Sequence, residues 1–291
     1  MNKTLTLLSF LVLIAFLGGV VYGHVDQSVS RSDTDTTNTM TKALDRSHAL
    51  SELTRAMVKD SQGQYVGRIT DVVISINGRI SFVVLSQLTM DGKLVALPFN
   101  ALSFDEKGKS LVLDTTSDKL ANAPIFNRSY LSARSWAEDS NRYFGIGPSW
   151  GEERKENLCD KAAAAAPQIS MTEGWNRPYE STEIVGTQVR NPQGEELGKV
   201  DDLVFDTEGR ISFVIVGYGG FLGISQNLVA VPVNFLSYAE QPRHFVLDAT
   251  KEKIQSASPF SRRTLDDPEW AKGVYRYFGQ QPNWTTEDKE K

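Results

Sequence analysis

The hexapeptide GRISFV occurs twice in this chain, at residues 78–83 and again at residues 209–214. The match extends beyond the six letters at the same spacing of 131 residues, so that Asp71 aligns with Asp202. A repeat this long indicates a duplicated domain, because the repeats of solenoid proteins are far shorter. The sequence therefore predicts two copies of one fold.

The correspondence continues to the end of each copy, with three extra residues in one loop of the second copy. Pro98 matches Pro232 at the new spacing of 134 residues, and the stretch 136–150 matches 270–284. These last two stretches are rich in Trp, Tyr and Phe and follow the strand-like part of each copy. Each copy is therefore predicted to be a barrel-sized segment followed by a short helical aromatic tail.

The strand-like part shows apolar residues at every second position, which is typical of a β-strand. Asn77-Gly78 separates two such runs and is a strong hairpin signal, because the turn requires positive φ at both positions. The predicted strand faces are Val72, Ile74 and Ile76 before the turn, and Ile80, Phe82 and Val84 after it. Short strands with glycine turns predict a mostly β protein with two small, closed or partly closed barrels in tandem.

Length and charge limit the classes of function. The chain has 291 residues, enough for about two domains, with 40% hydrophobic and 23% charged residues as in a folded soluble protein. The formal net charge is −5 and no long basic run is present. Nucleic acid is therefore not an expected partner, because phosphate neutralisation by Lys and Arg dominates such binding.

The N-terminus predicts export. Lys3 precedes an almost unbroken apolar stretch from Leu5 to Val21, so residues 1–23 are predicted to be a signal peptide or an uncleaved N-terminal anchor. Residues 24–46 are mainly Ser, Thr, Asp and Asn and are predicted to be a disordered tether. We expect a periplasmic or otherwise extracytoplasmic protein, either soluble or held by the N-terminal helix.

The order of glycines, aspartates and apolar residues in both copies resembles the PRC-barrel domain. The matching residues are Val58, Asp60, Gly63, Gly67, Ile69 and Asp71 in the first copy, and Val189, Asn191, Gly194, Gly198, Val200 and Asp202 in the second. A Gly-Arg-Ile hairpin, an apolar strand and a step from Val and Ala to Pro follow in each. The resemblance implies a barrel that binds proteins, as in the photosynthetic reaction centre H subunit and a ribosome-maturation factor, and it implies no catalytic residue.

A direct search for reactive groups predicts no catalytic, cofactor-binding or metal-binding residue. The three histidines do not have the spacing of metal ligands. The aspartates that recur, Asp71 with Asp202 and Asp114 with Asp248, fit hydrogen-bond acceptors at strand ends better than a catalytic pair. The glycine-rich stretch 217–223 lies between two predicted strands, so it fits a hairpin tip better than a phosphate-binding loop.

The candidate interaction surface consists of aromatic tail residues and an apolar loop tip. In the tails, these residues are predicted mainly to fold back, closing the barrel end or joining the two copies. Trp and Tyr are also enriched where proteins bind one another, so partner binding stays open. The loop tip could touch a partner or a lipid surface. The candidates are Trp136, Tyr143, Trp150, Phe221, Leu222, Trp270, Tyr277 and Trp284.

These observations predict a first domain at 47–150, a helical linker at 151–178 and a second domain at 179–291. The expected function is a non-catalytic protein-binding or assembly module of the cell envelope, with a protein partner that the sequence does not identify and with membrane-surface contact as an additional expectation. Two alternatives remain open. One is an envelope hydrolase or small-ligand enzyme that uses the cleft between the copies, and the other is a structural stress-response protein.

Overall fold

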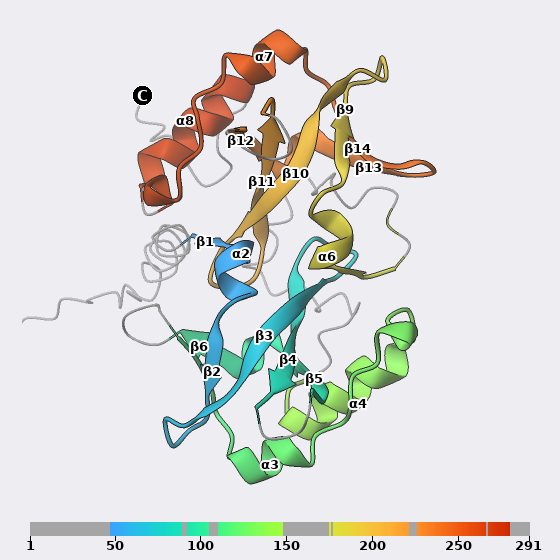
Figure 1. Ribbon diagram of the computed structural model, residues 1–291, viewed down its shortest axis with the longest axis vertical. Coiled ribbons are helices and arrows are strands. Elements are labelled where there is room, and N and C mark those ends of the chain that lie inside the picture. The colour runs from blue at the N-terminus through green and yellow to red at the C-terminus, as the bar shows by residue number, and fades with distance from the viewer. Residues whose placement is uncertain are drawn as a thin grey trace, which may run out of the picture.

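The computed structural model contains two curled β-sheets that lie one above the other along the long axis of the molecule (Figure 1). One sheet comes from each copy. The structure describes residues 47–88, 92–104, 110–147, 175, 177–220, 226–265 and 267–279. The predicted signal, the tether and nearly all of the predicted helical linker lie outside these residues.

The elements of the two copies follow the same order along the chain. The first copy contains β1 (His48–Ala49), α2 (Leu50–Leu53), β2 (Met57–Lys59), β3 (Tyr65–Ile74), β4 (Ile80–Gln87), β5 (Leu94–Pro98), η1 (Phe99–Ala101), β6 (Leu102–Phe104), β7 (Leu111–Leu113), α3 (Ser117–Ala121), η2 (Arg128–Tyr130) and α4 (Arg134–Phe144). The second contains β8 (Tyr179–Glu180), α6 (Ser181–Ile184), β9 (Gln188–Arg190), β10 (Glu196–Phe205), β11 (Ile211–Tyr218), β12 (Asn227–Pro232), η4 (Val233–Phe235), β13 (Leu236–Glu240), β14 (Arg243–Leu247), α7 (Lys251–Gln255), η5 (Arg262–Thr264) and α8 (Pro268–Phe278).

The two sheets have the same topology. The strand order is β5-β4-β3-β2-β7-β6 in the first and β12-β11-β10-β9-β14-β13 in the second. All neighbours are antiparallel except β2 with β7 and β9 with β14, which are parallel. We call β2–β7 the first barrel and β9–β14 the second barrel. The predicted fold class, mostly β with two tandem barrels and helical aromatic tails, is confirmed.

The predicted hairpin is present, but two side chains were assigned to the wrong face. Gly78 takes a φ of 71° at the turn between β3 and β4. Ile76 lies in this turn, past the end of β3, and is 49% exposed. Ile80 packs in the main core, whereas Phe82 and Val84 face the opposite side of β4. A register shift between β3 and β4 beside Ile80 breaks the simple alternation on which the prediction depended.

Both faces of the central strands are buried, which explains their continuous apolar runs. The inner faces of both barrels contribute to one core that extends across the two copies. On the outer face of β4, Phe82 and Val84 pack under α4 together with Ala137. On the equivalent face of β11, Phe213 and Ile215 pack under α8. The helical tails therefore cover the outer face of their own sheets.

Each barrel receives a short strand and helical turn from the other copy. We call His48–Leu53 (β1 and α2) the first lead-in segment, and Tyr179–Ile184 (β8 and α6) the second lead-in segment. β1 pairs with β10 of the second barrel, and β8 pairs with β3 of the first. The two copies are thus joined by a reciprocal exchange, with α2 and α6 lying between the two sheets (Figure 1).

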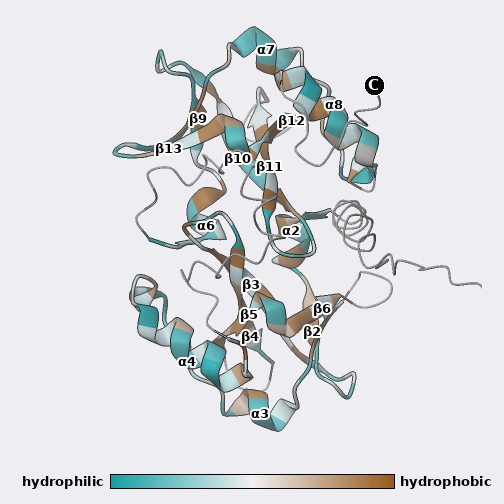
Figure 2. Cartoon of the chain, turned by 180° about the vertical axis from the view of Figure 1, so that it is seen from behind, coloured by the Kyte–Doolittle hydropathy of each residue, from teal (hydrophilic) through white to brown (hydrophobic). Residues whose placement is uncertain are grey.

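The distribution of hydropathy agrees with this arrangement. Hydrophobic residues lie on the strands and on the sides of the helices that face them, whereas the outward-facing sides of α4 and α7 are hydrophilic (Figure 2). Within the described ranges, none of the helices is long and apolar enough to span a bilayer.

Candidate functional site

The two copies of GRISFV meet at the centre of the molecule. Arg79 and Arg210 form an antiparallel bridge, flanked by hydrogen bonds from Ile80 N to Gly209 O (2.8 Å) and from Ile211 N to Gly78 O (3.2 Å). A Cβ at Gly209 would lie 3.0 Å from the Phe99 ring and 3.1 Å from Ile80 O, so glycine permits the close approach. The first three residues of the hexapeptide thus form part of the contact between the barrels.

Asp71 holds the second lead-in segment against the first barrel. Its fully buried carboxylate accepts hydrogen bonds from Ser181 Oγ (2.6 Å), from Thr182 Oγ1 (2.7 Å) and from Thr182 N (3.4 Å). It also accepts one from the N–H of Val72 at 2.8 Å, and Arg128 Nη2 lies 3.5 Å away. Three of these four hydrogen bonds come from the second lead-in segment.

Asp202 makes the equivalent contact on the other side. It accepts hydrogen bonds from Ser51 N (3.0 Å) and Ser51 Oγ (2.5 Å) of the first lead-in segment, and from Leu203 N at 2.9 Å. Arg262 Nη2 lies 3.3 Å from its carboxylate. The repeated aspartates therefore receive hydrogen bonds from the copy to which they do not belong. These hydrogen bonds hold the two copies together.

Among the differences between the two junctions, one replaces a carboxylate at the β3–β8 junction by a methyl group at the β1–β10 junction. Glu180 pairs with Val73 of β3 and is 6% exposed, whereas its counterpart Ala49 is buried among apolar residues beside β10. Glu180 Oε1 lies 3.3 Å from Arg128 Nε. Burial, together with the negative charge of Asp71, raises the pKa of Glu180 to about 6.

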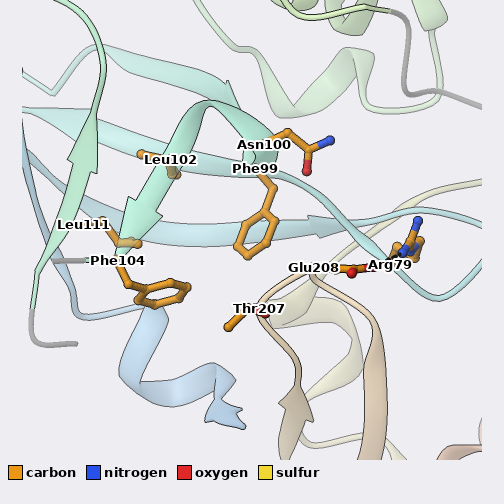
Figure 3. A pocket seen from close by; sticks show the side chains of 8 residues that line it. All are labelled: Arg79, Phe99, Asn100, Leu102, Phe104, Leu111, Thr207 and Glu208. Carbon is orange, nitrogen blue, oxygen red and sulfur yellow. Dashed lines mark hydrogen bonds and ion pairs between the residues drawn. The ribbon is translucent and has the colours of Figure 1, made fainter. Parts of the chain in front are cut away.

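A pocket of about 360 Å³ opens beside the hairpin tips (Figure 3). Phe99, Leu102 and Phe104 form its apolar wall, and the exposed residues Thr207 and Glu208 of the second barrel form its rim. The remaining lining residues are Arg79, Asn100 and Leu111. Arg79 and Glu208 make an ion pair of 3.3 Å across the two copies. The pocket thus combines an apolar wall with four polar residues, Arg79, Asn100, Thr207 and Glu208.

A second pocket of about 520 Å³ adjoins the first, because Phe104 and Leu111 line both. It extends to Leu53 of the first lead-in segment and to Phe205 of the second barrel. The ring of His48 stacks on Phe104 with centroids 4.2 Å apart. We call the two pockets together the inter-barrel groove. Its walls come from both copies, so it depends on their exchange of lead-in segments.

In the second copy the equivalent place is filled by side chains. Trp175 packs on Tyr179 and Tyr238, with centroids 4.6 and 6.1 Å apart. The guanidinium of Arg177 lies 4.1 Å from the centroid of the Tyr179 ring and 2.6 Å from the carboxylate of Glu183. Burial raises the pKa of Tyr179 well above its ordinary value. Among the described residues, the groove therefore lies beside the first barrel.

The predicted surface residues that the structure describes lie at two opposite ends. Trp136 packs edge-on against Phe82, with centroids 4.9 Å apart, and Trp270 packs on Phe213 at 5.1 Å. Both are half-buried parts of the cores under α4 and α8. Each tail covers its own sheet, and the core under α8 also contains Ala49 of the first lead-in segment. Trp150, Phe221, Leu222 and Trp284 lie outside the described residues.

The two tail tyrosines are better placed for contact with a partner. The hydroxyl of Tyr143 donates to Lys119 O at 2.5 Å, and that of Tyr277 donates to Lys253 O at 2.6 Å. Each hydroxyl ties α4 or α8 to the preceding short helix. Tyr277 is 39% exposed and Tyr143 is half-buried. Sequence reasoning named a cleft between the copies only for the alternative enzyme, and it did not identify the residues that line the groove, because they come from distant parts of the chain.

Other candidate chemistry is limited in the part of the chain that the structure describes. No cluster of three or more His, Cys, Asp or Glu side chains there could hold a metal ion. His48 and His244 lie on opposite copies. The glycine-rich stretch connects β11 to β12, as predicted, with Gly219 and Gly220 at φ values of 69° and 76°.

Comparison with known proteins agrees with this architecture. A family model for the PRC-barrel domain matches residues 45–120 and 178–254, which together make up just over half of the chain. No curated protein matches the chain. The two matched regions correspond to the two barrels with their lead-in segments. The chain therefore belongs to the PRC-barrel domain family, with two copies of the domain in tandem.

Proposed function

We propose that this protein is a non-catalytic binding and assembly module of the cell envelope, in which two PRC barrels together present the inter-barrel groove to a partner protein. The observation that carries the proposal is the groove itself, whose lining residues come from both copies. Large aromatic and aliphatic side chains in such a place are typical of protein contact surfaces. The apolar N-terminal sequence supports export of the chain to the envelope.

The hydrogen bonds of the repeated aspartates support a role without catalysis. Asp71 and Asp202 each serve the lead-in segment of the other copy and do not line the groove. An Asp202→Asn variant would weaken the contact between the barrels, so its loss of any activity would not identify a catalytic residue. The Arg79–Glu208 ion pair lies at the rim of the groove and does not hold a lead-in segment, so Glu208→Gln is the sharper variant for a test of catalysis.

A capture experiment with the full chain tests the proposal. The tagged protein is mixed with envelope extract, and the retained proteins are compared with those retained by Thr207→Arg and Asn100→Arg. Both positions are exposed at the groove, so arginine there obstructs the groove without entering the core. Ser103→Arg is the matched control, because Ser103 is exposed on β6 between two groove residues and is not part of the lining.

We expect a specific protein to be retained by the wild-type chain and by Ser103→Arg, and retention to fall at least about tenfold in both groove variants. Equal retention by all four proteins would place the contact elsewhere, and no retained protein would count against the binding role. The full chain is required, because each isolated barrel would lack the lead-in segment that satisfies its buried aspartate. Mass spectrometry of the mature N-terminus separately tests export and cleavage near residue 23.

A further inference from the structure

The junction between the second lead-in segment and the first barrel contains two carboxylates close to one guanidinium. Arg128 lies 3.5 Å from Asp71 and 3.3 Å from Glu180. Both carboxylates are buried, with side-chain exposures of 0% and 8%, whereas the arginine is 45% exposed. The partly exposed guanidinium of Arg128 is therefore the positive partner of two buried carboxylates.

Asp71 receives more hydrogen bonds at this junction than Glu180 does. Its oxygens receive the hydroxyls of Ser181 and Thr182. Glu180 accepts one hydrogen bond from the backbone N–H of Glu183, whereas its Oε1 is buried and accepts none among the described residues. The carboxylate of Glu180 is thus the less stabilised of the two, and burying an incompletely paired charge is unfavourable.

The remaining charges that face Glu180 do not supply the positive charge that its carboxylate lacks. Glu183 on α6 and Arg177 just before β8 are the other two charged groups that act on it. They pair with each other at 2.6 Å, so together they add little net charge. At the opposite junction, Ala49 takes the place of Glu180, and Arg262 there faces the single carboxylate of Asp202.

We propose that the contact between the second lead-in segment and the first barrel is proton-responsive: protonation of Glu180 tightens β8 on β3, and its ionisation at neutral pH loosens the contact. The opposite junction, between β1 and β10, lacks the equivalent carboxylate and does not respond. Acidity would therefore control how firmly one half of the module is held, whichever partner binds the inter-barrel groove.

The direction follows from proton linkage. With β8 in place, the pKa of Glu180 is about 6, and in the separated state the group returns to its ordinary value of 4.5. The closed junction therefore binds the proton more tightly and gains stability as the pH falls through 6, with the full effect below 4.5. The stabilisation is lost as the pH rises through 6. These two values give a change of about eightfold in the closed-to-open ratio between pH 7.5 and pH 5.

Hydrogen exchange of backbone amides measures the local opening of each junction in the intact protein. Protection factors, corrected for the intrinsic pH dependence of exchange, are compared between pH 7.5 and pH 5 for the β3–β8 pair and for the β1–β10 pair. We expect protection of the β3–β8 amides to rise about eightfold on acidification, while that of the β1–β10 amides stays within about twofold. The β1–β10 pair is thus an internal control for general effects of pH.

The Glu180→Gln variant keeps the shape of the side chain and removes its titration. We expect its β3–β8 protection to be the same at both pH values, with β1–β10 protection as in the wild type showing that the fold is intact. The Glu180→Ala variant, which reproduces the opposite junction, is expected to behave alike. Equal pH responses at the two junctions, or a response that persists in Glu180→Gln, would overturn the proposal.

Discussion

Replacement of Asp71 by alanine tests whether the repeated aspartates hold the two copies together. The change removes the acceptor for three donors of the second lead-in segment: the hydroxyls of Ser181 and Thr182 and the N–H of Thr182. A buried donor left without a partner costs about 1–3 kcal/mol, and removal of one member of a buried charged network costs about 3–5 kcal/mol.

Two features reduce the expected cost. Thr182 is exposed, so its hydroxyl can turn towards water, and loss of the Asp71 charge removes its repulsion of Glu180. We therefore expect Asp71→Ala to lower the free energy of unfolding by about 2–3 kcal/mol. Urea denaturation followed by tryptophan fluorescence measures this change, and hydrogen exchange shows whether protection is lost first in β8 and α6.

Asp60→Ala is the matched control for this experiment. Asp60 is also a buried aspartate of the first copy, but it accepts hydrogen bonds only within that copy, from Gln62 N, Gln64 N and Ser117 Oγ. We expect this variant to leave β8 protected. The reasoning is refuted if Asp71→Ala costs less than about 1 kcal/mol, or if β8 stays as protected as in the wild type.

Three further predictions concern the cores. Gly67→Ala should destabilise the protein by about 1–3 kcal/mol, because the added Cβ would lie 2.5 Å from Ser86 O; calorimetry measures the loss in Tm. Trp136→Ala should cost about 3 kcal/mol in chemical denaturation, since the ring packs in the core under α4, and unchanged stability would contradict that placement. Burial raises the pKa of Tyr275 to about 12, so this tyrosine should ionise late in alkaline absorbance titration, as should Tyr179, and Tyr275→Phe should reduce the late step by the absorbance of one tyrosine. Because the folded state holds this proton more tightly, the corresponding stability is lost as the pH rises through 12.

The sequence predicted the parts of the fold that depend on local pattern. The duplicated hexapeptide predicted two copies, Asn77-Gly78 predicted the hairpin, and the aromatic stretches predicted helical tails. The faces of Ile76 and Ile80 were wrong, because period-two alternation fails where the register shifts beside the turn. Patterns of residue type contain no information about such a shift.

The exchange of lead-in segments could not be predicted in the same way. A two-residue strand such as β1 has no measurable periodicity, and its partner in β10 lies more than 150 residues away. A weak signal was nevertheless present: Ser51 and Thr182 have the same spacing as Asp71 and Asp202. Each of these hydroxyl residues binds the aspartate of the opposite copy. The residues that line the groove were not predicted, because their positions depend on this exchange.

The position of β1 determines how the molecule bears tension. A pull on the chain at residue 47 enters through two residues that are hydrogen-bonded to the second copy, and the contact of Ser51 with Asp202 follows directly behind them. The force is therefore applied to the second copy before it is applied to β2 of the first copy. A chain held by its N-terminal segment would resist extraction with both halves at once, as a single mechanical unit.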